Sequence, residues 1–115
     1  TEDHQWIHVD EERAKNELPT QSTIAHGFLS LSLSVPLAAQ VWTVTGAKML
    51  INYGLNKVRF INMVPVNSKV RMSVKVKEVN ELDNGGTQVI SEETLEIEGQ
   101  EKPAYVAELI MVAYK

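Results

Sequence analysis

The chain has 115 residues, of which 43% are hydrophobic and 23% charged, a balance typical of one folded domain. It contains no cysteine, which excludes disulfides, thiolate metal sites and a cysteine nucleophile and fits a reducing compartment, so we expect a cytoplasmic protein. The net charge is -4 and the basic residues are scattered, so we expect no nucleic-acid partner.

The first predicted element is a short surface helix from Val9 to Glu17. This segment is rich in helix-forming residues, Asp10 is a suitable N-cap, and carboxylates fill the opening turn, where they favour the helix dipole. The dipeptide Leu18-Pro19 ends the helix, because a residue before proline avoids the helical conformation.

A second, apolar helix is predicted from Ile24 to Leu33. Only small serines interrupt this segment, which is typical of a helix surrounded by protein, and Pro36 kinks or restarts it. A strand is the alternative, because leucines 29, 31 and 33 alternate with serines. The apolar run from Phe28 to Val41 contains serines, a proline and a glutamine and is too short for a membrane helix, so we expect no membrane partner.

Four strands are predicted after Gly46. The second has the clearest period-two alternation, and the sequence Asp-Asn-Gly-Gly at 83–86 predicts the hairpin turn that follows it. Gly54 indicates a bulge or bend inside the first strand, and the last strand is apolar on both faces, which predicts an interior position. The predicted strands span residues 48–63, 70–79, 87–98 and 103–114.

These elements predict a single α+β domain over residues 1–115, with one helix buried against an antiparallel sheet. A helix that is apolar on every side is fully covered only if the sheet curls around it or a second copy helps to cover it.

The stretch Asp3 to His8, "DHQWIH", brings a carboxylate close to two imidazoles. Asp3 and His8 are five residues apart and can meet across a turn, where a carboxylate and an imidazole suit proton transfer and activation of water. A metal site formed by His4, His8 and Asp10 is an alternative, although no second ligand cluster accompanies it.

Gly27 lies in the opening turn of the apolar helix. Amide groups there have no intrahelical partner and can hold a developing oxyanion. From composition alone, the simpler interpretation is that this glycine allows tight packing.

The segments "DHQWIHVD" and "IAHGFLSLSL" resemble the hydratase signature of the MaoC-like dehydratases, the (R)-specific enoyl-CoA hydratases of the hot dog fold. The stretches "NYGLNKVRFINMVPVNSKVRMSVKVKEV" (52–79) and "LEIEGQEKPAYVAE" (95–108) resemble the branch that includes nodulation protein N-like members. The resemblance covers almost the whole chain. It implies a curved antiparallel sheet wrapped around a central buried helix.

The resemblance also implies roles for individual residues. Asp3 and His8 correspond to the catalytic dyad, and the Gly27 amide to the group that binds the thioester carbonyl. The family pattern Gly-Asp-x-Asn-Pro-x-His is altered here, with Glu2 for the glycine and Gln5-Trp6 for Asn-Pro. The amide of Gln5 can still position a partner, and Trp6 is expected to reshape the pocket.

Some family members carry a serine on the central helix within reach of the histidine. Val35 stands at that spacing in this chain, which leaves Ser32 or Ser34 as the candidate substrate-binding serine.

The activity implied by the resemblance is addition of water to a trans-2-enoyl-CoA to give an (R)-3-hydroxyacyl-CoA. The CoA thioester is the substrate and no cofactor or metal is expected. The alternatives are a non-catalytic hot dog domain that binds acyl-CoA or a protein partner, and a hot dog thioesterase. The resemblance further implies a homodimer and a few dozen residues before the Asp3 motif, so we expect that the chain lacks an N-terminal segment.

Overall fold

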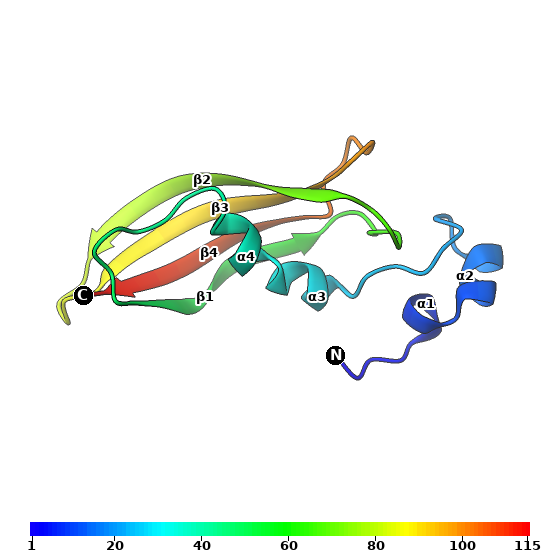
Figure 1. Cartoon of the computed structure of the whole chain (residues 1–115), viewed down its shortest axis with the longest axis horizontal. Helices are drawn as coiled ribbons and strands as arrows, with labels where there is room; N and C mark the ends of the chain where they lie inside the picture. The colour runs from blue at the N-terminus through cyan, green and yellow to red at the C-terminus, as the bar shows by residue number, and fades with distance from the viewer.

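The computed structural model describes all 115 residues, Thr1 to Lys115. Four antiparallel strands form one curved sheet in the order β1-β4-β3-β2, which confirms the predicted four-strand sheet (Figure 1). None of the helices combines the length and the apolar content that crossing a membrane requires. The strands are β1 (Met49–Phe60), β2 (Val70–Glu81), β3 (Thr87–Ile97) and β4 (Tyr105–Tyr114).

The last strand, β4, lies between β1 and β3 and pairs with both, which confirms its predicted interior position. The register between β1 and β4 shifts between Asn52 and Gly54, so the predicted bulge at this glycine is also confirmed. The prediction that the first strand continues to Met63 is wrong. The chain leaves the sheet after Phe60 and reaches Pro65, which forms an isolated bridge with Ile24 instead.

Strand β3 alternates strictly between buried and partly exposed residues, as a strand with one covered face should. Its buried side chains face the helices, and Leu95 belongs to a core cluster with Met72, Ala104 and Tyr105. The same alternation places a carboxyl group, that of Glu93, inside the protein.

Two short helices, α1 (Trp6–Val9) and α2 (Glu11–Glu17), lie beyond one end of the sheet (Figure 1). The Asp10 carboxylate accepts a hydrogen bond from the Arg13 amide at 3.0 Å, so the predicted N-cap is confirmed. The helix α1 was not predicted, because one turn of four residues carries too little periodicity to be detected.

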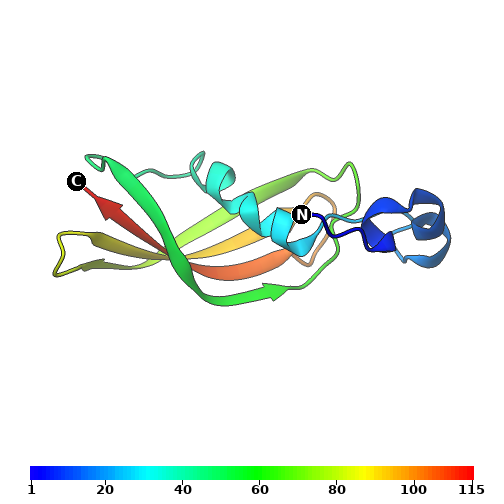
Figure 2. The ribbon, with the colours of Figure 1, turned by 90° about the horizontal axis from the view of Figure 1, so that it is seen from below.

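The apolar segment is helical from Gly27 onward, and the strand alternative is wrong. The predicted start at Ile24 is also wrong, because Ile24 forms the bridge with Pro65. The segment forms two short helices, α3 (Gly27–Ser32) and α4 (Ser34–Ala38), with Leu33 between them. Both lie along the concave face of the sheet (Figure 2). Pro36 lies in the first turn of α4, where its missing N–H costs little. The predicted restart of the helix near this proline is therefore confirmed.

The expectation that this helix is buried on every side is wrong for the single chain. Ser30, Ser34 and Ala38 are buried, whereas the side chain of Phe28 is 77% exposed and Val35 is also exposed. One four-stranded sheet covers only one side of a helix, and the small residues occupy that side because they allow close approach. Leu31 and Leu37 pack against the core cluster, whereas the side chains of Phe28, Leu29, Leu33 and Val35 face outward.

Candidate active site

The side chain of His8 is held by a hydrogen bond to the backbone carbonyl of Ile24. His8 lies in α1 with its side chain only 8% exposed, and its Nδ1 is 2.8 Å from the carbonyl oxygen of Ile24. A carbonyl can only accept, so Nδ1 carries a proton, and in the neutral ring Nε2 is an acceptor. The fold therefore holds His8 in the tautomer whose free nitrogen can take up a proton.

Asp3 approaches that free nitrogen from the solvent side. Its Oδ2 lies 3.9 Å from His8 Nε2, and its side chain is 55% exposed. The spacing is too long for a direct hydrogen bond, but one water molecule can donate to both acceptors. The structure thus brings together the two residues that the sequence predicts as a dyad.

A tight turn holds the Asp3 carboxylate. The Gln5 amide donates to Asp3 Oδ1 at 3.1 Å, so Gln5 contacts the dyad through its backbone. Glu2 has φ of 56°, a left-handed conformation that favours glycine. This explains why a glycine at this position suits the motif. Trp6 packs under the Arg13 guanidinium, 4.1 Å from the ring centre, and does not line the cavity described next.

His8 and Gly27 line one cavity of about 420 Å³, together with Ser30 and Phe60. Gly27 is the first residue of α3, so its amide has no partner within the helix. A Cβ at this position would lie 3.2 Å from Cε1 of Phe60. The lack of a side chain is compatible with both interpretations of Gly27, because it permits tight packing against Phe60 and places no side chain of its own over the amide.

The serine on the cavity wall is Ser30, not the predicted Ser32. The Ser30 side chain is buried and lines the cavity beside His8. Ser32 is exposed, donates to the Leu29 carbonyl at 2.7 Å and is absent from the cavity wall. Ser34 lies one turn beyond Ser30 and lines a different cavity. The sequence spacing expected from the family could not show how the helix is rotated against the sheet. The burial of Ser30 shows which serine faces the cavity.

A second histidine, His26, was missed. Its ring stacks on His8 with centroids 3.9 Å apart, and its Nε2 lies 2.9 Å from both Thr1 Oγ1 and the Asp3 carbonyl oxygen. It precedes Gly27 directly, and this position beside the helix start was the only signal in the sequence. His26 ties the Asp3 turn to the start of α3.

The predicted alternative metal site is not assembled. His4 lies near Glu2, and Asp10 caps α2. A different set, Asp3, His8 and His26, places one possible ligand atom from each residue within 4.8 Å of the others. These are ligand types that suit a transition metal such as zinc.

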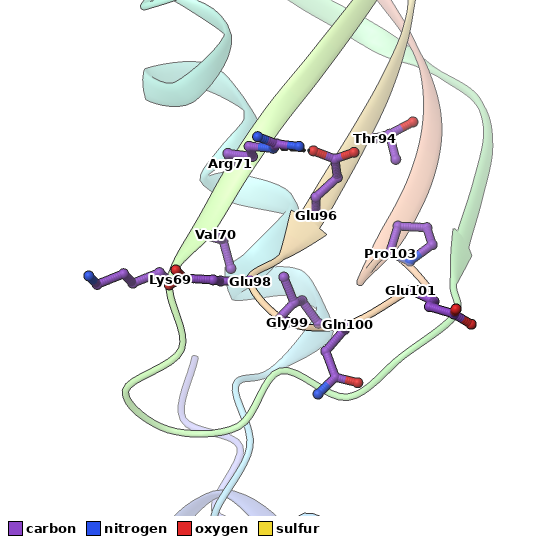
Figure 3. Close-up of a pocket in the computed structure, with 11 residues that line it drawn as sticks. Lys69, Val70, Arg71, Thr94, Glu96, Glu98, Gly99, Gln100, Glu101 and Pro103 are labelled. Atoms are coloured by element: carbon purple, nitrogen blue, oxygen red, sulfur yellow. Dashed lines mark hydrogen bonds and ion pairs between the residues drawn. The ribbon is translucent and has the colours of Figure 1, made fainter.

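A larger concavity of about 520 Å³ lies near the β3–β4 turn, away from the dyad. Arg71 and Glu96 point toward each other there and form an ion pair (Figure 3). It contains no buried polar atom without a partner, and its charged side chains reach solvent. Its geometry offers no reactive group.

Comparison with known proteins identifies the family. The model of the MaoC like domain matches residues 1–98. The chain belongs to the MaoC-like family. It is 53% identical over 111 residues to 3-hydroxyacyl-thioester dehydratase Z of Mycobacterium tuberculosis, covering 96% of this chain and 73% of that protein. It is 40% identical to Nodulation protein N of Rhizobium leguminosarum bv. viciae, covering 97% and 70%. The predicted family and its nodulation protein N-like relatives are thus confirmed.

Solved structures confirm the hot dog fold. The R-hydratase PhaJ1 of Pseudomonas aeruginosa superposes with a TM-score of 0.69 at 22% identity, covering 98% of this chain and 66% of that one. A monoamine oxidase regulatory protein from Archaeoglobus fulgius gives a TM-score of 0.75, also at 22% identity, covering 96% and 73%.

Proposed function

We propose that this MaoC-like protein is a hydro-lyase that interconverts a trans-2-enoyl-CoA and an (R)-3-hydroxyacyl-CoA. The observation that carries the proposal is the 3.9 Å approach of Asp3 Oδ2 to the acceptor nitrogen of His8, beside a cavity that His8 and Gly27 both line. The 53% identical mycobacterial relative, named as a 3-hydroxyacyl-thioester dehydratase, supports the same chemistry.

In this mechanism one water molecule donates to both Asp3 and His8. Its oxygen adds to C3 of the enoyl group, the dyad accepts a proton from it, and a proton passes to C2. The Gly27 N–H stabilises the negative charge that develops on the thioester oxygen. Loss of a comparable oxyanion donor lowers turnover by about 10²- to 10³-fold.

The Ile24 carbonyl has a positioning role in this scheme. By accepting the proton of His8 Nδ1 at 2.8 Å, it keeps Nε2 free for the water. It also stabilises the imidazolium that forms when Nε2 takes up a proton. His26 stacks on one face of the His8 ring and limits its rotation.

The same proposal includes a homodimer. The exposed apolar side chains of α3 and α4, with Phe28 the most exposed, need cover that this chain does not supply. A second copy is the proposed cover. Light scattering of the purified protein tests it, and a monomer at micromolar concentration would contradict it.

Hydration of crotonyl-CoA, followed by loss of enoyl absorbance and chiral analysis of the product, tests the activity. Asp3→Asn and His8→Gln in the full-length protein should each lower turnover by roughly 10²- to 10⁴-fold while the protein remains folded. Full activity of a folded Asp3→Asn variant would remove Asp3 from the mechanism. Release of free thiol without loss of the enoyl group would instead indicate a thioesterase, and binding without turnover a non-catalytic domain.

A further inference from the structure

A second cavity, of about 140 Å³, lies between α4 and the sheet. Most of its wall is apolar and comes from α4, β1 and β4. Five of its residues carry side chains that can hydrogen-bond, and Glu93 is the only acid or base among all the lining residues. At roughly 30 Å³ for each water molecule in the liquid, the space holds a few waters or one small polar group.

Two buried polar atoms of the residues that line this cavity have no hydrogen-bond partner. They are Trp42 Nε1 and Glu93 Oε2. Glu93 is only 1% exposed, and Trp42 and Glu93 line the cavity itself. Buried polar atoms nearly always have a partner, and two such atoms without one on the residues of a single cavity wall indicate that a polar group belongs in this cavity.

The charge state of Glu93 fits such a group. Burial raises the pKa of the Glu93 carboxyl to about 7, and the Ser91 hydroxyl lowers it by a smaller amount. Near neutral pH the side chain is therefore available as an acceptor or as a donor. The indole N–H of Trp42 can only donate. A hydroxyl group satisfies both, because it can accept from the indole and donate to the carboxylate.

This cavity and the dyad cavity share one helix face. Ser30 lines the dyad cavity and Ser34 lines the second one, and the two serines are one helical turn apart. Between Gly27, where the thioester carbonyl would bind, and Ser34, the helical rise corresponds to roughly 10 Å. An acyl chain of medium length spans this distance.

On the sheet side, the side chains of Phe60 and Tyr105 lie between the two cavities. Phe60 contacts the Gly27 position and packs edge-to-face on Tyr105, with ring centroids 6.2 Å apart. The Tyr105 hydroxyl in turn lies near Glu93 and Ser34. An acyl chain that follows the inner face of α3 and α4 from Gly27 would therefore reach Ser34 and the cavity at Glu93.

We propose that the cavity at Glu93 and Trp42 binds a hydroxyl group on the distal part of the acyl chain, so that the preferred substrates are medium-chain enoyl thioesters that carry such a hydroxyl. This inference rests on the proposed hydratase function and names its substrate class. Glu93 and Trp42 are specificity residues and do not contact the reacting carbons.

The test compares three CoA thioesters on full-length protein: crotonyl, trans-2-octenoyl and 8-hydroxy-trans-2-octenoyl. We expect the hydroxylated octenoyl substrate to have a kcat/KM at least about tenfold above that of octenoyl, because a pocket built for a hydroxyl discriminates against a chain that lacks it. Glu93→Leu should abolish this preference, mainly through KM. Crotonyl-CoA is too short to reach the cavity, so its turnover should be unchanged.

Two further variants separate recognition from folding. Trp42→Phe removes only the N–H donor and should also reduce the preference, whereas Glu93→Gln keeps an acceptor and should retain part of it. Glu92→Gln, on the neighbouring and partly exposed position of β3, is the matched control and should retain all of it.

Equal kcat/KM for the two octenoyl substrates in a protein that hydrates crotonyl-CoA would overturn this inference and leave the hydratase function intact. It would mean that water alone fills the cavity. Failure to hydrate any of the three substrates would overturn the proposed function, and this inference with it.

Discussion

Replacement of Glu93 by glutamine should change how the stability of the protein depends on pH. Burial raises the pKa of this carboxyl from 4.5 to about 7 in the folded protein, whereas the unfolded chain exposes it to water. Between these two values the folded state binds more protons than the unfolded state. The free energy of unfolding therefore falls as pH rises through this range.

The size of the effect follows from the shift in pKa. Each pKa unit corresponds to about 1.4 kcal/mol, so raising the pKa from 4.5 to about 7 costs the folded state about 3 kcal/mol at pH 8 relative to pH 4. Glutamine has nearly the same shape and no charge. The Glu93→Gln protein should lack this loss and be more stable than the wild type at pH 8 by about the same amount.

Urea denaturation at pH 4.5, 6 and 8, at one protein concentration, measures the difference. Glu92→Gln removes a carboxylate from the next residue of β3, whose side chain is only partly buried, and should reproduce the wild-type pH dependence. Parallel stability curves for the wild type and Glu93→Gln would refute the reasoning, because Glu93 would then be ionised or solvated equally in both states.

Three further predictions concern the dyad cavity. Gly27→Ala places a methyl group 3.2 Å from the Phe60 ring, so the amide should be misplaced and kcat/KM for crotonyl-CoA should fall by about 10²-fold. Adding Phe60→Leu to this variant should recover part of the loss. Ser30→Ala should reduce turnover about tenfold, whereas Ser32→Ala should leave it nearly unchanged, because only Ser30 lines the cavity. Equal effects of the two substitutions on turnover would contradict this assignment. Treatment with EDTA should leave activity intact, and loss that zinc restores would make the dyad a metal site instead.

The local pattern of the sequence determined the strands and the first helix cap. Period-two alternation located β2, because a strand with one covered face must alternate, and the Asp-Asn-Gly-Gly turn located the start of β3. The run that is apolar on both faces located β4. Gly54 marked the bulge in β1, and Asp10 marked the start of α2, since each depends on backbone geometry within a few residues. The motif around Asp3 and His8 identified the family.

Contacts between distant parts of the chain were decided only by the tertiary structure. His8 owes its tautomer to the Ile24 carbonyl, sixteen residues away, and His26 stacks on it across a similar separation. The rotation of α3 and α4 against the sheet selected Ser30 and turned Phe28 outward. Such choices depend on which surfaces pack together, and a helix that is apolar on nearly every side carries no pattern that fixes its rotation.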